Sequence, residues 1–177
     1  MKIKNMKIKN FNFTRDWLVG FTQSDGSFVI YFENKKEGLI IRPQPIFNLT
    51  QSINELEMFI ELQKYLGVGR IHKNRNNVTF VVNSINEIIT VILPLFDNSS
   101  LRGSKLLSYN IFKEVSLMIK NKKHLTLEGT LQIIDLAYFM NKETSLRSLE
   151  TKNILMNKLR LKYGTLPIVK KKLNYLK

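Results

Sequence analysis

Apolar and polar residues follow helical and strand spacing in a fixed order along the chain. Helical stretches alternate with paired segments that are rich in aromatic and β-branched residues. We predict helices at 14–25, 53–66 and 85–96, and strands at 26–35, at 37–51 and, as a shorter pair, within 68–83. The order αββαββα predicts an α+β fold, in which helices cover one face of a four-stranded, antiparallel, saddle-shaped sheet and leave the other face free.

Helical periodicity continues beyond this core. Further helices are predicted at about 104–120, 126–140 and 147–162. No stretch rich in Gly, Pro or Ser separates them from the core. We therefore expect a single domain over 1–177, with a core at about 13–120 and a C-terminal helical extension at about 121–177.

The helices predicted at 53–66 and 85–96 begin with the same four residues. Ser52 and Ser84 each open the sequence Ser-Ile-Asn-Glu before an apolar run. This is the capping-box pattern, in which a serine side chain accepts a hydrogen bond from a backbone N–H of the first turn. Each serine is expected to be the N-cap of its helix.

Alternation along the strands assigns side chains to two faces of the sheet. Phe28, Phe47 and Phe80 lie on the apolar face, which we predict to be the core side. The side chains predicted to point outward, or to lie in the adjoining turn, are Ser27, Val29, Tyr31, Glu33, Lys35, Arg42, Gln44, Asn48, Arg70, His72, Asn74, Arg75, Thr79 and Asn83. Such side chains can read base edges in a DNA major groove, and an ordinary solvated face is the alternative.

Two prolines mark the second predicted strand. Pro43 and Pro45 both lack an amide donor on the same side of the strand. A central strand would lose ladder hydrogen bonds at these positions, so we predict an edge strand.

The charge of the chain points to a polyanionic partner. The 177 residues carry a formal net charge of +14, and 44% of them are hydrophobic, enough for a real core. Nucleic acid is the first choice of partner, and an anionic membrane surface or a basic structural role is the alternative. No cysteine is present, and His72 and His124 lack the spacing of metal ligands. No apolar run reaches the length that spans a membrane.

The helix at 14–25 ends on a carboxylate. The carbonyl end of a helix is already partly negative, so Asp25 there needs either a turn role or a cation beside it. Trp17, Gly20, Phe21 and Ser24 form one stripe of the helix. Small residues four apart, such as Gly20 and Ser24, let two helices approach closely; a glycine tolerated in a core helix is the other interpretation.

The stretch Leu18 to Gly26, LVGFTQSDG, resembles the signature motif of the LAGLIDADG homing endonucleases. It opens an αββαββα unit in a basic chain, as it does in that family. IFNLTQ at 46–51 resembles the second strand of the family, and LGVGRI at 66–71 its entry to the third. HLTLEG at 124–129 is similar to organellar members. Gln23 departs from the motif, which has an acidic residue there.

The resemblance implies a metal-dependent enzyme that hydrolyses both strands of a specific DNA site. Asp25 matches the acidic metal-binding position, and the Ser24 carbonyl a further ligand. Mg²⁺ is the expected cofactor, and Ca²⁺ or Mn²⁺ is expected to substitute in binding. Gln51 matches a polar residue that orders water, and Lys105 matches the basic residue beside the active site. Both are therefore expected in catalysis.

Only one copy of the motif is present, which predicts a homodimer with a long, nearly palindromic target. Trp17, Gly20, Phe21 and Ser24 are the expected dimer contacts. The alternative is a non-cleaving protein of the same fold, such as a maturase that binds its intron RNA. Richness in Lys, Asn and Ile suggests an AT-rich genome, so an organelle is the expected location.

Overall fold

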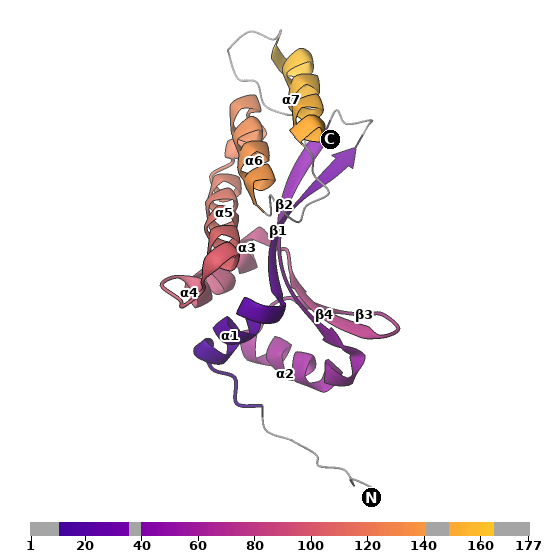
Figure 1. Ribbon diagram of the computed structural model, residues 1–177, viewed down its shortest axis with the longest axis vertical. Coiled ribbons are helices and arrows are strands. Elements are labelled where there is room, and N and C mark those ends of the chain that lie inside the picture. The colour runs from indigo at the N-terminus through magenta and orange to yellow at the C-terminus, as the bar shows by residue number, and fades with distance from the viewer. Residues whose placement is uncertain (1–10, 36–39, 141–148, 165–177) are drawn as a thin grey trace, which may run out of the picture.

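The computed structural model describes residues 11–35, 40–140 and 149–164. Their elements follow the predicted order and confirm the α+β fold (Figure 1). The core consists of α1 (Arg15–Asp25), β1 (Gly26–Lys35), β2 (Ile40–Ser52), η1 (Ile53–Glu55), α2 (Leu56–Leu66), β3 (Arg70–Lys73), β4 (Asn77–Val82), α3 (Ile85–Glu87), η2 (Ile88–Ile92) and α4 (Leu93–Phe96). The helices that follow are α5 (Gly103–Lys120), η3 (Lys123–Leu125), α6 (Leu127–Phe139) and α7 (Leu149–Gly164).

The four strands form one antiparallel sheet in the order β1-β2-β4-β3. β1 and β2 make a long hairpin, in which Gly26 pairs with Leu49 at one end and Lys35 with Ile40 at the other. β4 pairs with β2 only from Phe47 onward. The far part of the hairpin therefore extends beyond the other two strands, as Figure 1 shows.

The edge-strand prediction for the proline segment is wrong for the strand as a whole, because β2 lies between β1 and β4. Pro43 and Pro45 pair with Phe32 and Ile30 of β1, in the part of β2 that precedes the ladder to β4. Within the described residues this part has a sheet neighbour on one side only. The missing amide donors therefore cost no ladder bond to β4.

The core lies between the sheet and the helices, as the alternation predicts. Phe28 is its centre, and its ring lies 5.2–5.3 Å from the rings of Phe47, Phe96, Tyr109 and Phe112. All five side chains are buried. Aromatic pairs at such distances add to the stabilisation from apolar burial, so this cluster holds α4 and α5 against β1 and β2.

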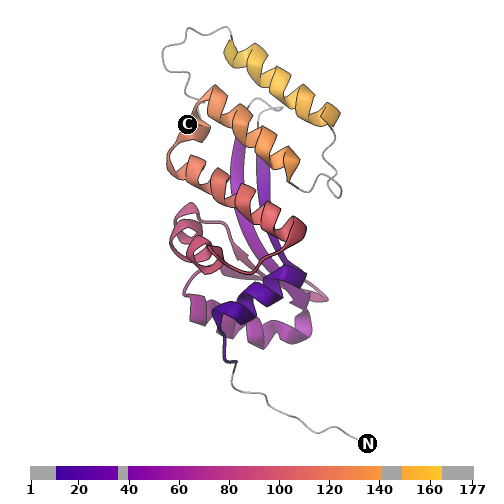
Figure 2. The same cartoon turned by 60° about the vertical axis from the view of Figure 1, so that its left-hand side comes forward.

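The C-terminal helices follow one another along the hairpin. Figure 2 shows α5 and α6 in front of β1 and β2, and α7 beyond α6, toward the far end of the hairpin. Ile134 of α6 and Leu159 of α7 are buried together with Met156 and Tyr163 in a second, smaller cluster. Lys152 of α7 and Asp135 of α6 form an ion pair at the edge of this cluster. Figure 1 shows no helix of the described residues over the opposite face of the hairpin.

Both predicted serine caps are present, with one difference. The backbone N–H of Glu87 donates to Ser84 Oγ at 3.5 Å, while Ser52 Oγ accepts from Asn54 at 3.4 Å and starts a 3-10 turn before α2. The Glu87 carboxylate does not close a capping box: it accepts from the Gly69 N–H at 3.3 Å. The same four residues thus begin two helices by different hydrogen bonds.

Candidate active site and DNA-binding face

Helix α1 ends at Asp25, and the chain passes directly into β1 at Gly26. Thr14 caps the other end by accepting from the Trp17 N–H at 3.1 Å. A Cβ at Gly26 would lie 2.8 Å from Thr22 Cα and 2.6 Å from Thr22 Cγ2, closer than real contacts allow. Packing at the helix-to-strand turn therefore requires a glycine at position 26.

The Asp25 carboxylate lies exposed at the tip of α1. Its Oδ2 accepts from Ser24 Oγ at 2.8 Å, and the same hydroxyl lies 3.2 Å from the carbonyl oxygen of Phe21. The last turn of α1 contains no basic residue. The carboxylate and the negative helix end therefore reinforce each other and favour a cation at this point.

Lys105, on the first turn of α5, brings a cation to this tip. Its Nζ donates to the Gly26 carbonyl, across 79 positions of sequence. Burial lowers the pKa of Lys105 below the ordinary lysine value of 10.5, and the negative charge of Asp25 acts in the opposite direction. The structure thus brings together Asp25 and Lys105, which the sequence could pair only by resemblance.

Gln51 comes to the same end of the sheet. It lies two residues after Leu49, the pairing partner of Gly26, and its own partner is Val78 of β4. Its side chain is half-buried. The predicted catalytic residues therefore come from three separate elements, α1, β2 and α5, that meet where β1 begins.

The oxygen atoms at the tip suit a hard divalent cation. Asp25 offers an exposed carboxylate, whose Oδ2 accepts from Ser24 Oγ, and the preceding residue, Ser24, has a backbone carbonyl oxygen. Among the described residues no group of three or more His, Cys, Asp or Glu side chains gathers at one point. Mg²⁺ commonly binds through one or two carboxylates together with phosphate oxygens and water, so the residues fit this ion as part of a shared site.

The register places the predicted outward side chains on one face of the sheet. Cross-strand partners point to the same side, and the paired residues on the face opposite the core are Ser27 with Asn48, Val29 with Ile46, Tyr31 with Gln44, Glu33 with Arg42, Arg70 with Val81, and His72 with Thr79. We call this face of the sheet the outer face. Tyr31 is 50% exposed on it.

Hydrogen bonds orient polar groups on the outer face and in the turn beside it. Arg70 Nη2 donates to Asn83 Oδ1 at 2.7 Å, which orients the guanidinium. Asn74 and Arg75 lie in the β3–β4 turn, where the Arg75 N–H donates to Asn74 Oδ1 at 2.7 Å. Lys35 ends β1, and its side chain lies outside the described residues.

Sequence reasoning missed Thr50. It is exposed on the outer face, and its hydroxyl lies 2.9 Å from that of Thr79. The same alternation that selected Asn48 could have found it.

A basic groove borders the outer face on the unpaired side of β2. Its volume is about 740 Å³, and Arg42 and Gln44 share its lining with Lys120, Lys122 and His124. Burial lowers the pKa of His124, and the neighbouring charge of Arg42 lowers it further. Positive charge thus continues from the sheet to the end of α5, an arrangement that favours phosphate groups.

The predicted stripe of α1 divides into two parts. Trp17 and Phe21 stack on each other at 5.0 Å and pack against rings of the same chain, Phe13 and Phe59. Gly20 and Ser24 are exposed, and apart from the adjacent residues and the backbone of α1 itself no described atom lies within 4 Å of a Cβ built on Gly20. The small residues therefore leave an open surface along α1.

The described helices are all too short or too polar to cross a membrane.

Comparison with known proteins gives a consistent result. The LAGLIDADG endonuclease family matches residues 18–116. A probable intron-encoded DNA endonuclease of Mycosarcoma maydis is 50% identical over 160 residues, which are 90% of this chain and 58% of the relative. The chain therefore spans little more than half the length of this relative.

Two solved structures support the same assignment. The LAGLIDADG homing endonuclease I-LtrWI, bound to its target DNA, has a TM-score of 0.74 and 30% identity, over 82% of this chain and 50% of its own. I-SmaMI, bound to uncleaved DNA in the presence of calcium ions, has a TM-score of 0.71 and 25% identity, over 93% of this chain and 54% of its own. With its motif at the end of α1 and its αββαββα core, this chain belongs to the LAGLIDADG endonuclease family.

Proposed function

We propose that the protein is a homing endonuclease that cleaves both strands of one specific DNA site as a homodimer with divalent metal ions. The observation that carries this proposal is the juxtaposition of Asp25 and Lys105 at the exposed end of α1. A protein that only binds nucleic acid has no need of a carboxylate at a helix end that faces phosphates. The outer face supports the DNA-binding part of the proposal.

Each predicted site residue has a separate role in the proposed reaction. Asp25 and the Ser24 carbonyl would hold Mg²⁺, and the bound ion would supply positive charge to polarise the scissile phosphate and stabilise the leaving oxygen. The Lys105 ammonium, held at the Gly26 carbonyl, places positive charge beside the phosphate that Asp25 approaches. Gln51 offers an amide that can orient the attacking water. The outer face lies in the major groove, where its polar side chains meet base edges.

One chain provides a single motif carboxylate, so the site needs a second copy of the fold. The open surface at Gly20 and Ser24 supports α1 as the dimer contact, because small residues there allow the backbones of two helices to approach closely. A pair of identical subunits has a two-fold axis, which favours a long, nearly palindromic target. The relatives are about twice as long as the matched region, so a second copy within a longer polypeptide is the alternative arrangement.

The relatives support proposals on the metal ion that the protein uses and on the gene that encodes it. Calcium ions accompany uncleaved DNA in the I-SmaMI structure, which supports Ca²⁺ as a metal that allows binding here, with Mg²⁺ the ion for cleavage. The Mycosarcoma maydis relative is described as intron-encoded. We infer that this chain is also encoded by an intron and acts in an organelle. Binding of intron RNA, as in a maturase, is the second candidate function, because the basic groove extends beyond the outer face.

The decisive experiment compares the wild type with Asp25→Asn on cognate DNA, in Mg²⁺ and in Ca²⁺. We expect cleavage only by the wild type in Mg²⁺, and binding by both proteins in Ca²⁺. Asp16→Asn is the matched control, because it removes an exposed carboxylate from the opposite end of the same helix. Cleavage by Asp25→Asn at the wild-type rate would exclude the catalytic role. Intron binding without any DNA cleavage by the wild type would favour the maturase function.

Oligomeric state is a separate test. Sedimentation of the free protein and of its DNA complex should give twice the chain mass of 20.7 kDa for the protein component. A single chain in both states at micromolar concentration would refute the homodimer and leave the longer polypeptide as the alternative.

A further inference from the structure

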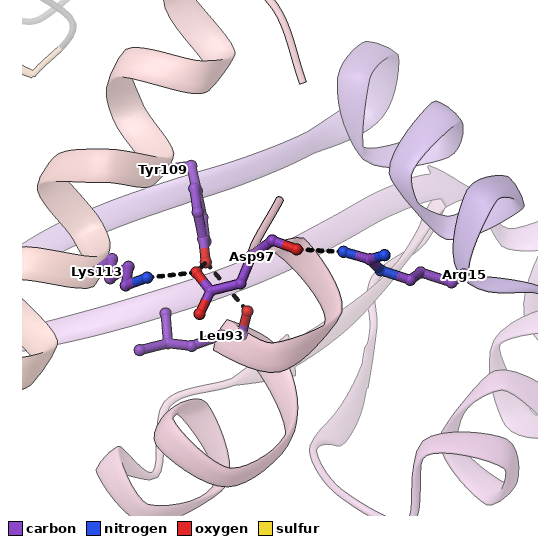
Figure 3. A network of polar contacts seen from close by, with 5 residues as sticks. All are labelled: Arg15, Leu93, Asp97, Tyr109 and Lys113. Atoms are coloured by element: carbon purple, nitrogen blue, oxygen red, sulfur yellow. Dashed lines mark hydrogen bonds and ion pairs between the residues drawn. The ribbon is translucent and has the colours of Figure 1, made fainter. Parts of the chain in front are cut away.

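The connection between α4 and α5, residues 97–102, contacts both ends of helix α1. At the start of α1, the Arg15 guanidinium donates to the carbonyls of Leu95, at 2.8 Å, and of Asp97. Figure 3 shows how Asp97 faces Arg15 through its backbone carbonyl and turns its carboxylate toward α5. The connection is therefore fixed at one end by an α1 residue that lies far from Asp25.

The Asp97 carboxylate anchors this end of the connection to α5. Its Oδ1 accepts from Tyr109 Oη and from Lys113 Nζ, both at 2.5 Å (Figure 3). The Tyr109 hydroxyl also lies 3.1 Å from the Leu93 carbonyl. The Lys113 and Tyr109 contacts, in that order, hold the pKa of Asp97 below its usual value. The connection thus joins α1, α4 and α5 in one network.

The other end of the connection meets α1 at Gln23. Gln23 Oε1 accepts a hydrogen bond from the Arg102 N–H at 3.0 Å. Arg102 is the N-cap residue of α5, and its own side chain caps none of the free N–H groups in the described structure. Gly103 follows with φ +55°, a conformation that favours glycine. Gln23 therefore contacts the chain at the point where α5 begins.

Two hydrogen bonds connect the start of α5 to the residues around Asp25. Arg102 lies three residues before Lys105, and Gln23 lies three residues before Gly26, whose carbonyl accepts from Lys105 Nζ. The start of α5 is thus attached to α1 on one side and to the first residue of β1 on the other. A shift of the α5 start would carry Lys105 away from Asp25.

We propose that Gln23 is a positioning residue, whose amide oxygen fixes the start of α5 and thereby holds Lys105 beside Asp25. The motif of the family has an acidic residue at this position, and a carboxylate can accept the same hydrogen bond. Gln23 keeps the acceptor without adding a negative charge two residues from Asp25, at a helix end that is already negative. The departure from the motif therefore preserves the geometry. This inference rests on the proposed endonuclease function.

The test uses three variants of the full chain. Gln23→Ala removes the acceptor, Gln23→Glu keeps an acceptor at the same length, and Gln132→Ala removes an exposed glutamine from α6 as the matched control. Single-turnover cleavage in Mg²⁺ and target affinity in Ca²⁺ separate catalysis from binding. For Gln23→Ala we expect the cleavage rate to fall on the order of tenfold to a hundredfold at unchanged affinity. Gln23→Glu should recover most of the rate.

Two measurements do not depend on activity. Hydrogen exchange of the Arg102 amide should accelerate in Gln23→Ala, and the Lys105 amine should react faster with an acylating reagent. Unchanged exchange and unchanged Lys105 reactivity would overturn the proposal, as would a wild-type cleavage rate in Gln23→Ala. If the wild type does not cleave but both measurements change as expected, the endonuclease function fails and the positioning of Lys105 by Gln23 stands.

Discussion

A methyl group at Gly20 should raise the stability of the single chain but weaken the association of two chains into the proposed dimer. Gly20 lies midway along α1, and a Cβ at this position meets no described atom within 4 Å apart from the adjacent residues and the backbone of α1 itself. In the single chain, Gly20→Ala therefore adds helix propensity without a clash. In the proposed dimer, the same methyl group lies at the closest approach of two α1 helices.

The size of each effect can be estimated. Replacing glycine by alanine in a helix interior gains about 0.5–1 kcal/mol of unfolding free energy. For a chain of this length, 1 kcal/mol corresponds to a rise in Tm of about 2–4 °C. In a helix contact that requires small residues, overpacking costs about 1–3 kcal/mol, which weakens association about 5- to 150-fold.

Urea unfolding at a protein concentration below the dimer dissociation constant measures the first effect, and sedimentation equilibrium measures the second. Gly26→Ala is the control, because its Cβ would lie 2.8 Å from the backbone of Thr22. The same chemical change should there lower the free energy of unfolding by about 1–3 kcal/mol. Cleavage by Gly20→Ala should fall with dimer formation and recover at high protein concentration.

A Gly20→Ala protein that associates and cleaves like the wild type would contradict a contact between two α1 helices at Gly20. That result would mean that the open surface of α1 lies outside the contact between copies. A loss of stability in the single chain would contradict the structure itself, since it requires an atom near Gly20.

Three further outcomes follow from the charges and hydrogen bonds. Asp25→Asn removes the carboxylate that raises the pKa of Lys105, so an NMR titration should show the Lys105 pKa lower than in the wild type. Tyr109→Phe leaves its ring packed but removes the donor to Asp97, which should cost about 1.5–3 kcal/mol in urea unfolding. Because the folded-state pKa of Asp97 is below 3.8, its contribution to stability is present above pH 3.8 and is lost as the pH falls through the lowered value. Acid unfolding curves of Asp97→Asn should therefore show a smaller loss at low pH than those of the wild type.

Local patterns predicted the elements because they act over a few residues. Strand alternation assigned the two faces of β1 and β2 correctly, and Ser84 caps its helix as its sequence indicates. The prediction that β2 is an edge strand was wrong for a related reason. Pro43 reports only on its own missing amide, whereas the place where β4 begins to pair depends on the whole sheet.

The candidate site depends on contacts between distant residues, which periodicity cannot reveal. Lys105 is 79 positions from the Gly26 carbonyl that it contacts, and only resemblance selected it. From the sequence, Gln23 is only a departure from the acidic residue of the motif. Its role depends on a hydrogen bond from the backbone N–H of Arg102. A backbone partner leaves no mark in the sequence, so this contact could be found only in the folded chain.

The direct passage from α1 into β1 has a consequence for the length of DNA that one chain can read. Gly26 accepts from Lys105, and Ser27, the next residue, already belongs to the outer face. From Gly26 to Glu33 an extended strand covers about 23 Å at about 3.3 Å per residue. DNA rises about 3.4 Å per base pair, so the length of this strand equals about seven base pairs, counted outward from the cleaved bond. In the proposed complex, the distance between the base pairs that are read and the bond that is cut is fixed by one continuous strand.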